Sequence, residues 1–340
     1  MSKILVTGGL GYIGSHTVVE LVNAGYEPII VDDLSNSHPK ILDQLSKILG
    51  FKPAFYQFDL CDEQKLADFV KLQPDISGII HFAAFKAVGE SVHDPLKYYR
   101  NNLYSLLNLL EVFKGKTVNF VFSSSCTVYG QPDELPVSET APIKPAQSPY
   151  GNTKQIAEEI LKDTVISGSA KKTIALRYFN PVGAHQSALI GELPIGVPQN
   201  LVPFLTQTAI GKREKITVFG NDYNTKDGSC VRDYIHVVDL AKAHVAALKL
   251  MEQEDFTGYD VFNIGTGKGN TVLEIILAFE SASGIKLNYT IGPRRNGDVE
   301  QVWGNVTKSE NELHWTAQLG INEMLSSSWA WEKYLSANPL

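Results

Sequence analysis

The fold is decided near the start of the chain, by Lys3-Ile4-Leu5-Val6-Thr7-Gly8-Gly9-Leu10-Gly11-Tyr12-Ile13-Gly14. An apolar run typical of a strand leads into a Gly-x-x-Gly-x-x-Gly pattern, and the residues up to Gly25 carry apolar side chains at helical spacing. Between a strand and a helix, this pattern is typical of a turn that binds the pyrophosphate of a dinucleotide. Gly8 permits the tight turn, Gly11 lets the backbone approach the phosphates, and Gly14 lets the helix pack on the strand.

Two aspartates follow the next predicted strand, Pro28–Val31. Asp32 lies 18 residues after Gly14, close to the spacing of about 20 expected for a carboxylate that binds the adenosine ribose. A carboxylate here repels the 2′-phosphate of NADP, so Asp32 and Asp33 favour NAD as the cofactor. The pair Asp59-Leu60 follows the third strand, where it is equally typical of an adenine contact and of a turn.

Strands and helices continue to alternate through the first half of the chain. This alternation predicts an α/β fold, a Rossmann-like doubly wound parallel sheet with a smaller C-terminal α/β domain that binds the substrate. Predicted strands cover residues 3–7, 28–31, 55–58, 78–83, 118–122 and 172–178, and predicted helices cover 12–25, 39–49, 63–72, 95–113 and 149–166.

The composition changes after Tyr178, because residues 180–220 are rich in proline and glycine. We therefore expect a dinucleotide-binding domain at residues 1–180 and a substrate-binding domain at residues 181–340. A helical pattern at 236–251 and a strand pattern at 260–264 predict that the chain returns to the first domain near 231–264.

Composition excludes several classes of protein. Apolar residues make up 44% of the chain and charged residues 20%, as in ordinary globular proteins. The net charge of −7 and the lack of a basic tail argue against a nucleic-acid partner, and no apolar run approaches the roughly 18 residues of a membrane span. The strand-like start leaves no room for a signal peptide, so we expect a cytoplasmic protein. Its three dispersed cysteines and its histidines predict neither disulfides nor a metal site.

A second motif combines Ser125, at the end of a predicted strand, with Tyr150-Gly151-Asn152-Thr153-Lys154. Tyr150 and Lys154 lie four residues apart on a predicted helix and therefore share one face. A nearby ammonium and a nicotinamide cation favour the phenolate of a tyrosine, whose ordinary pKa is about 10. The sequence thus predicts a base that takes a proton from a sugar hydroxyl, with Ser125 hydrogen-bonded to that hydroxyl.

These motifs resemble those of the extended short-chain dehydrogenase/reductase family, and the resemblance spans essentially the whole chain. The segments that carry it, besides the glycine turn and the Tyr-x-x-x-Lys motif, are 81–91 (HFAAFKAVGES), 123–130 (SSSCTVYG), 177–181 (RYFNP), 231–237 (VRDYIHV) and 294–298 (RRNGD). Within the family they are similar to the branch that epimerises nucleotide sugars at C4. The resemblance implies an NAD-dependent isomerase that interconverts UDP-glucose and UDP-galactose in galactose metabolism, through a transient 4-keto sugar. It also implies a homodimer, with the helices 95–113 and 149–166 as its interface.

The resemblance assigns roles residue by residue, with Tyr150 as the catalytic base, Ser125 at the reacting hydroxyl and Lys154 as the residue that tunes Tyr150 and holds the nicotinamide ribose. Cofactor-binding residues would be Gly8, Gly11, Tyr12, Ile13, Gly14, Asp32, Asp33, Leu34, Ser35, Asn36, Ser37, Asp59, Leu60, Phe82, Ala83, Ala84, Lys86, Asn101, Ser125, Tyr150, Lys154 and Phe179. The UDP-sugar would be held by Lys86, Ser125, Tyr150, Tyr178, Asn180, Asn200, Leu201, Thr217, Val218, Phe219, Arg232, Arg295, Asp298 and Val302. From the residues alone, Arg232 fits a diphosphate and an ion pair with Asp233 equally well, and Phe219 fits a uracil contact and a core position equally well.

Three other functions compete with this interpretation. A nucleotide-sugar 4,6-dehydratase on the same fold would carry an Asp-Glu pair just after the strand-end serine, where this chain has Cys126 and Thr127. A simple dehydrogenase would release NADH, and a nucleotide-sensing binding module would turn nothing over. The intact Ser125, Tyr150 and Lys154 argue against the binding module.

One position bears on the choice of sugar. The residue four places after Asp298 is Val302, and the resemblance puts it at the sugar end of the pocket, where some bacterial relatives have a tyrosine. A small side chain would leave room for a 2-acetamido group, which predicts some activity on UDP-GlcNAc and UDP-GalNAc. Simple apolar packing of Val302 is an equally good interpretation.

Overall fold

The first unit of the molecule is a seven-stranded parallel sheet. The computed structural model describes residues 1–170, 172–295 and 299–339. In the order β10-β6-β5-β4-β1-β2-β3, the strands are Gly258–Ile264, Lys172–Tyr178, Asn119–Ser123, Ile76–His81, Lys3–Thr7, Glu27–Asp32 and Ala54–Gln57. Every neighbouring pair runs parallel. The predicted doubly wound fold is confirmed.

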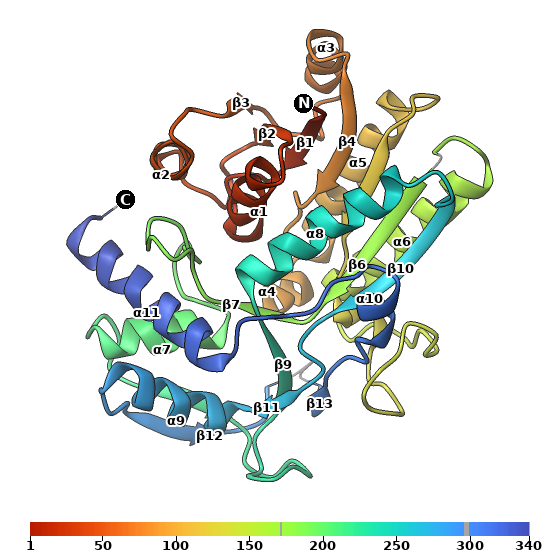
Figure 1. Cartoon of the computed structure of the whole chain (residues 1–340). Helices are drawn as coiled ribbons and strands as arrows, with labels where there is room; N and C mark the ends of the chain where they lie inside the picture. The colour runs from red at the N-terminus through yellow and green to blue at the C-terminus, as the bar shows by residue number, and fades with distance from the viewer. Residues whose placement is uncertain (171, 296–298, 340) are drawn as a thin grey trace.

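Helices cover both faces of this sheet (Figure 1). One face carries α1 (Tyr12–Asn23), α2 (Lys40–Leu49) and α8 (Val237–Glu252). The opposite face carries α3 (Glu63–Leu72), α5 (Pro95–Val112) and α6 (Pro149–Ile166), and α4 (Val88–His93) is short and packs on α5 and α6. Strands buried on both faces explain the continuous apolar runs in the sequence.

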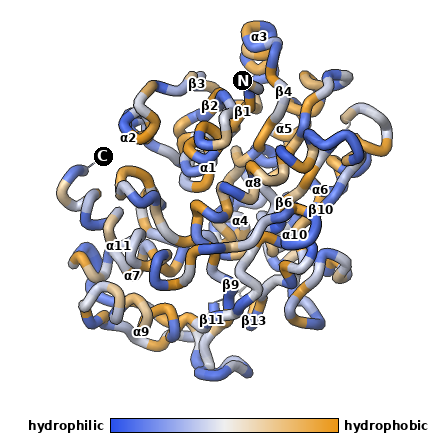
Figure 2. Tube along the Cα trace, in the orientation of Figure 1, coloured by the Kyte–Doolittle hydropathy of each residue, from blue (hydrophilic) through white to orange (hydrophobic). Residues whose placement is uncertain are grey.

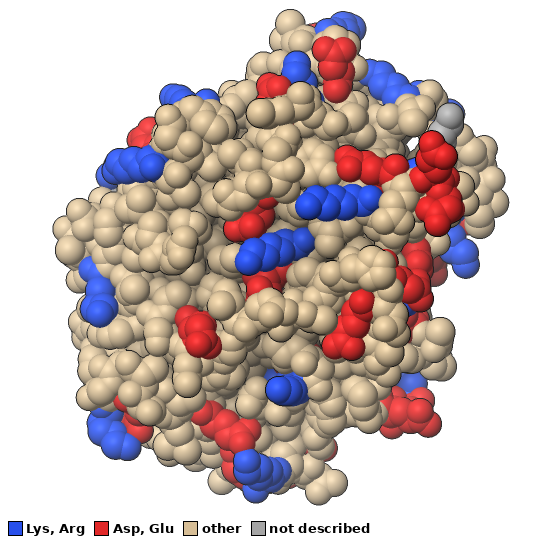
Figure 3. Space-filling model, in the orientation of Figure 1, with Lys and Arg blue, Asp and Glu red and all other residues tan. Residues whose placement is uncertain are grey.

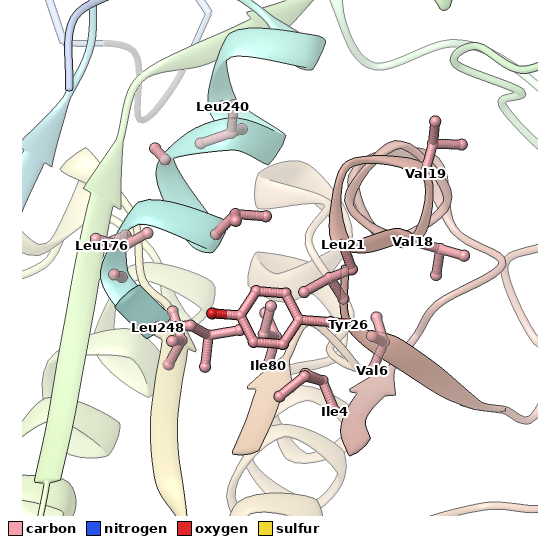
Figure 4. Packing of buried hydrophobic residues seen from close by; sticks show 14 of the residues in the cluster. Ile4, Val6, Val18, Val19, Leu21, Tyr26, Ile80, Leu176, Leu240 and Leu248 are labelled. Atoms are coloured by element: carbon pink, nitrogen blue, oxygen red, sulfur yellow. The ribbon is translucent and has the colours of Figure 1, made fainter. Parts of the chain in front are cut away.

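The alternation of side chains along each strand divides the core into two layers. Ile4 and Val6 of β1 belong to the cluster under α1 and α8, whereas Leu5 between them belongs to the cluster under α3, α5 and α6. Figure 4 shows part of the first cluster, in which Leu248 of α8 lies near Tyr26 and Leu240 lies farther along the same helix. The hydropathy-coloured trace shows apolar and polar residues interleaved along these helices (Figure 2).

The second unit lies beyond the carboxyl end of β6 and has its own small sheets. Its mixed sheet contains β7 (Asn180–Val182), β9 (Val231–His236), β11 (Gly269–Thr271) and β13 (Gln301–Val302), and a separate pair joins β8 (Ile216–Phe219) to β12 (Tyr289–Gly292). Its helices are α7 (Leu201–Ala209), α9 (Val272–Ser283), α10 (Thr307–Asn311) and α11 (Ile321–Ala337), and a 3₁₀ turn, η1 (Cys126–Tyr129), follows β5. A separate apolar cluster joins α7, α9, α11 and β8.

The chain passes between the two units more than once. It returns to the large sheet with α8 and β10, whereas β9, which precedes α8, pairs with β7, β11 and β13. Trp331 and Leu335 of α11 pack into the core cluster of the first unit. The end of the chain reaches back toward α2, where Lys40 Nζ donates to the carbonyl of Pro339 at 3.2 Å.

Charged side chains of both signs are interspersed on the face shown in Figure 3. Among the described helices, none is long and apolar enough to cross a membrane.

Candidate active site

The glycine turn between β1 and α1 is built for close approach of a ligand. Gly8 has φ +68°, and a Cβ on it would lie 3.0 Å from the backbone nitrogen of Ala83. A Cβ on Gly14 would overlap the carbonyl oxygen of Gly8. Helix α1 begins after Gly11 without a side-chain cap, so the amides of its first turn face outward with the positive end of the helix dipole. This cradle fits a pyrophosphate.

Asp32 closes the adjacent side of the turn. Its buried carboxylate accepts hydrogen bonds from the amides of Leu10 and Leu34, both at 3.0 Å, and from the hydroxyl of Ser37 at 2.7 Å. Burial raises the pKa of Asp32, and these three hydrogen bonds oppose the rise. Asp33 is exposed beside it. The carboxylate therefore orders the loop that follows β2 and also faces the cavity described next.

A cavity of about 570 Å³ runs along the carboxyl ends of the strands, from the glycine turn to the Tyr-x-x-x-Lys motif. In parallel α/β sheets this is where ligands bind. The predicted cofactor and substrate residues that line it are Gly8, Gly11, Tyr12, Ile13, Gly14, Asp32, Asp33, Ser35, Asn36, Ser37, Asp59, Leu60, Phe82, Ala83, Ala84, Lys86, Asn101, Tyr150, Lys154, Tyr178 and Asn200.

Helix α6 presents Tyr150 and Lys154 to this cavity. The helix starts at Pro149, and the side chain of Ser148 caps it by accepting from the amide of Gly151. Lys154 is 4% exposed, and its Nζ donates to the carbonyl of Ser123 at 2.7 Å. The same nitrogen lies 6.0 Å from the centre of the Tyr150 ring. The spacing of four residues therefore places the phenol and the ammonium side by side, as a Tyr–Lys pair requires.

Burial governs the protonation of this pair. It raises the pKa of Tyr150 well above the ordinary value, with a smaller contribution from Tyr178, while hydrogen bonding with Ser125 lowers it. Burial also lowers the pKa of Lys154 to about 7, and Glu158 opposes that fall. Both shifts disfavour charge, because the low dielectric penalises ions. Positive charge brought to the cavity would lower the pKa of the Tyr150 phenol and favour the phenolate.

Ser125 lies at the junction of β5 and η1. Its side chain is 6% exposed and caps η1 by accepting from the amide of Thr127 at 3.2 Å. Ser125 does not line the large cavity, but it hydrogen-bonds with Tyr150, which does. The three predicted catalytic residues are therefore neighbours at one end of the cavity.

The predicted nucleotide-sugar residues are scattered over the second unit. Arg295 lies over the ring of Phe219 at 5.6 Å, and Phe219 is 41% exposed on β8. Arg232 of β9 donates to the carbonyl of Val231 at 2.8 Å. Asp298 lies outside the described residues. Outside the large cavity lie Leu34, Ser125, Phe179, Asn180, Leu201, Thr217, Val218, Phe219, Arg232, Arg295 and Val302.

Two of these residues are packed in an apolar cluster. Phe179 and Val302 are 3% and 5% exposed and join Val128, Tyr129 and Val137 in one buried group. The Phe179 ring also fills the space where a Cβ on Gly304 would lie. The side chain of Phe179 is therefore part of the core. The burial of Val302 agrees with the interpretation that this residue serves apolar packing.

Known proteins combine the same glycine turn, Tyr-x-x-x-Lys motif and fold. Residues 5–328 match the family model described as GDP-mannose 4,6 dehydratase. The chain is 47% identical to the UDP-glucose 4-epimerase of Mus musculus, over 98% of this chain and 97% of that protein, and 49% identical to that of Bacillus subtilis, over 97% and 96%. The chain belongs to the UDP-glucose 4-epimerase family. The resemblance to the extended short-chain dehydrogenase/reductases is therefore confirmed.

Solved structures of the family superpose on the chain closely. The UDP-glucose 4-epimerase of Stenotrophomonas maltophila, with bound NAD and formylated UDP-arabinopyranose, matches with a TM-score of 0.95 at 43% identity and 99% coverage of both chains. That of Bifidobacterium longum, in complex with NAD+ and UDP, matches with a TM-score of 0.93 at 46% identity and 99% coverage of both chains.

Of the cavity wall at residues 191–200, sequence reasoning predicted Asn200 and missed the rest. Glu192 is the central residue of this wall, with an ion pair to Lys86 at 3.5 Å and a hydrogen bond from Asn200 Nδ2 at 2.6 Å. The Trp331 indole donates to the Glu192 carbonyl at 2.9 Å and fixes the segment to α11. The run Gly191-Glu192-Leu193-Pro194-Ile195-Gly196-Val197-Pro198 was read only as part of a glycine- and proline-rich stretch, because nothing in it forms a periodic pattern.

Two of the histidines, His236 and His244, have structural roles. His236 caps α8 by accepting from the amide of Val238, and His244 packs against Phe82 with ring centres 4.6 Å apart. Across residues 1–170, 172–295 and 299–339, no group of three or more His, Cys, Asp or Glu side chains could hold a metal ion.

Proposed function

We propose that the chain is an NAD-dependent UDP-glucose 4-epimerase of galactose metabolism, which interconverts UDP-glucose and UDP-galactose. The observation that carries the proposal is that one cavity joins the glycine cradle to Tyr150 and Lys154, with Ser125 beside Tyr150. A dinucleotide laid along it brings its nicotinamide end to the phenol.

We assign the cofactor to the residues of the cradle and the cavity. The amides at the start of α1 hold the pyrophosphate, Asp32 holds the adenosine ribose, and Lys154 holds the nicotinamide ribose. Bound NAD supplies a hydride acceptor and a positive charge at the nicotinamide. That charge lies where Tyr150 needs it, because burial alone keeps the phenol protonated.

The chain's own residues then handle the proton. Tyr150 as phenolate takes the proton of the sugar 4-OH, and Ser125 holds that hydroxyl by a hydrogen bond. Lys154 stabilises the phenolate from the next helical turn. The 4-keto sugar turns about its pyrophosphate link, and Tyr150 then returns the proton to O4. Because bound NAD would take up the C4 hydride and give it back on the other face, the net redox change is zero.

The second unit would hold the nucleotide end of the substrate. Arg232 and Arg295 suit the diphosphate as charge-assisted hydrogen-bond donors, and Phe219 offers an exposed ring face to uracil. We assign the remaining contacts to Lys86, Tyr178, Asn180, Asn200, Leu201, Thr217, Val218 and Asp298. Tight binding of the UDP end, unchanged throughout the reaction, together with a loosely held sugar would permit the 4-keto sugar to rotate about the pyrophosphate link. In domain terms, residues 1–180 with the return near 231–264 bind NAD, and the rest of 181–340 binds the UDP-sugar.

The dehydratase named by the family model is disfavoured at two positions. Elimination of water needs an acid and a base beside C5 and C6, and the residues after Ser125 are Cys126 and Thr127. Burial raises the pKa of the Cys126 thiol to about 12, so this thiol stays neutral and supplies no base.

We further propose a cytoplasmic homodimer that forms through α5 and α6. Leu96, Tyr104 and Leu107 of α5 are exposed apolar side chains on this surface, and surfaces of this kind mark interfaces. The three cysteines are free, as a reducing compartment requires.

The experiment that tests the activity is incubation of the purified chain with UDP-galactose and no added cofactor. We expect UDP-glucose to form, without release of NADH to the solution. A rise in absorbance at 340 nm on addition of bulk NAD would support a simple dehydrogenase instead, and no turnover of any UDP-sugar would support a binding module.

A further inference from the structure

A buried polar network lies directly behind the catalytic residues. Tyr150, Lys154 and Glu158 follow one another at intervals of four on α6 and therefore lie on one face of that helix. Tyr150 and Lys154 line the cavity, whereas Glu158 does not and is 8% exposed. The mechanism proposed above gives this buried carboxylate no task.

Glu158 is held by charge-assisted hydrogen bonds. Its Oε1 accepts from Ser124 Oγ at 2.5 Å and from Arg177 Nε at 3.0 Å, and its Oε2 accepts from Arg177 Nη2 at 2.6 Å. Arg177 also donates to the Tyr129 hydroxyl at 3.1 Å, which in turn donates to Asn263 at 2.7 Å. The network thus ties α6 to β5, β6, η1 and β10.

Stability alone is a weak reason for such a network. A buried ion pair loses hydration energy about as large as the attraction it gains, and apolar residues of similar volume often serve a core equally well. The position of the Glu158 network next to the catalytic residues suggests a role in the reaction. Ser124 immediately precedes Ser125, where the chain leaves β5 for η1, and the Glu158 carboxylate is one helical turn from Lys154.

We propose that Glu158 is a positioning residue for the reaction: through Ser124 it fixes the strand end that presents Ser125, and it places a negative charge one turn from the Lys154 ammonium. The inference rests on the proposed function and names a residue that assists it. Glu158 contacts neither substrate nor cofactor, and it acts through its neighbours.

The charge of Glu158 has a defined direction of effect. Burial lowers the pKa of Lys154 to about 7 and Glu158 opposes the fall, so removal of its charge lowers that pKa further. Lys154 then loses its proton at a lower pH, and a neutral amine no longer stabilises the Tyr150 phenolate. The other titratable groups around Lys154 and Glu158 are His81 of β4, Tyr129 of η1, Arg177 and Tyr178 of β6, and Tyr259 of β10.

The test is the pH profile of kcat for Glu158→Gln, which keeps the shape of the side chain, removes the charge and leaves one of the two accepting oxygens. The alkaline limb of the profile, where Lys154 deprotonates, is expected to move to lower pH by about one unit, which is about a tenfold loss of kcat above that limb. KM for UDP-galactose is expected to stay within about twofold, because Glu158 touches no substrate.

Two variants separate position from charge. Ser124→Ala removes one hydrogen bond and leaves the charge, so kcat is expected to fall several-fold at every pH with the alkaline limb unmoved. Glu332→Gln is the matched control, since Glu332 is also buried, accepts from Thr206 at 3.2 Å and pairs with Lys212 at 2.7 Å, far from Lys154 along the chain. It is expected to lower Tm and to leave the pH profile of kcat superimposed on that of the wild type.

A Glu158→Gln profile that superimposes on the wild type, in a folded protein, would overturn the proposal and leave Glu158 as a core ion pair. Should that variant not fold, Glu158→Asp keeps the charge and shortens the reach to Ser124. It is expected to lose kcat at all pH values with little movement of the limb, and an unchanged kcat would overturn the proposal equally. A wild-type chain with no epimerase activity would instead refute the proposed function.

Discussion

The cofactor cradle and the nucleotide-sugar side of this molecule are built in opposite ways. The cradle is one continuous strand-turn-helix segment whose glycines leave no space for side chains. On the other side, Arg232, Phe219 and Arg295 come from separate segments, and Phe219 is 41% exposed. The contrast fits an enzyme that keeps its cofactor in place while the sugar rotates. In the proposed function, the cradle is the rigid half that positions the hydride acceptor, and the nucleotide-sugar side is the adaptable half that binds the UDP end and lets the sugar rotate.

The same contrast explains what could be predicted from the sequence. Gly8 to Gly14 and Tyr150 to Lys154 are contiguous, with fixed spacing, so their chemistry could be read directly. The strands were predictable because β-branched and apolar runs alternate with amphipathic helices. In the second unit, β8 pairs with β12 although about seventy residues separate them along the chain, and no local pattern reports such a pairing. Helices α7, α9 and α11 were missed for a similar reason, since they pack on one another in a cluster of their own, and α11 also packs on the first unit through Trp331 and Leu335.

Site residues divide along the same line. Asp32 was predictable from spacing, but its hydrogen bonds with Leu10, Leu34 and Ser37 were not, because the loop after β2 has no regular pattern. Glu192 could be found only once the fold brought it to Lys86 and Asn200. The effect of burial on the pKa of Tyr150 could be found only from the structure. The sequence shows that Lys154 is a charged neighbour, but it does not show how deeply Tyr150 is buried.

Among the variants that compare the two halves, the largest effect is expected from disturbing the rigid half. Gly14→Ala places a methyl group against the Gly8 carbonyl, so the turn must open, at a cost of about 1–3 kcal/mol in the free energy of unfolding. We expect NAD to bind at least about tenfold more weakly, which corresponds to about 1.4 kcal/mol. Cofactor titration and thermal unfolding measure the two effects. Gly89→Ala is the control, because a methyl group there meets nothing within 4 Å, and equal NAD affinity in both variants would refute the cradle.

A smaller effect is expected on the adaptable half. Arg295→Met is expected to raise KM for UDP-galactose and Kd for UDP by about tenfold, with kcat within about threefold, because the lost contact binds ground state and transition state alike. Initial rates and calorimetry with UDP are the measurements. The neighbouring Arg294, which pairs with Asp222 at 2.7 Å and lies over Tyr223, provides the control. Should Arg294→Met raise KM as much, or Arg295→Met lower kcat alone, the assignment of Arg295 is wrong.

The smallest effect concerns the choice of sugar. Val302→Tyr is expected to lower the ratio of UDP-GalNAc to UDP-galactose turnover several-fold, if the bulk of this side chain sets the room for the acetamido group. Burial among Val128, Tyr129 and Val137 also predicts overpacking, with a lower Tm. Paired kcat/KM values for the two sugars, measured well below the Tm of the variant, decide the matter. An unchanged ratio with a lower Tm would leave Val302 as a packing residue.

The central claim is that the buried Tyr150 hydroxyl exchanges the proton with the sugar, and Tyr150→Phe tests it most directly. Steady-state conversion of UDP-galactose to UDP-glucose is the measurement, with NAD content and UDP affinity as checks on folding. We expect kcat to fall by at least about a thousandfold with both checks near wild type, whereas Tyr26→Phe, which removes only a hydrogen bond to Glu252, retains activity. A Tyr150→Phe enzyme that still interconverts the two sugars at near the full rate would contradict the account.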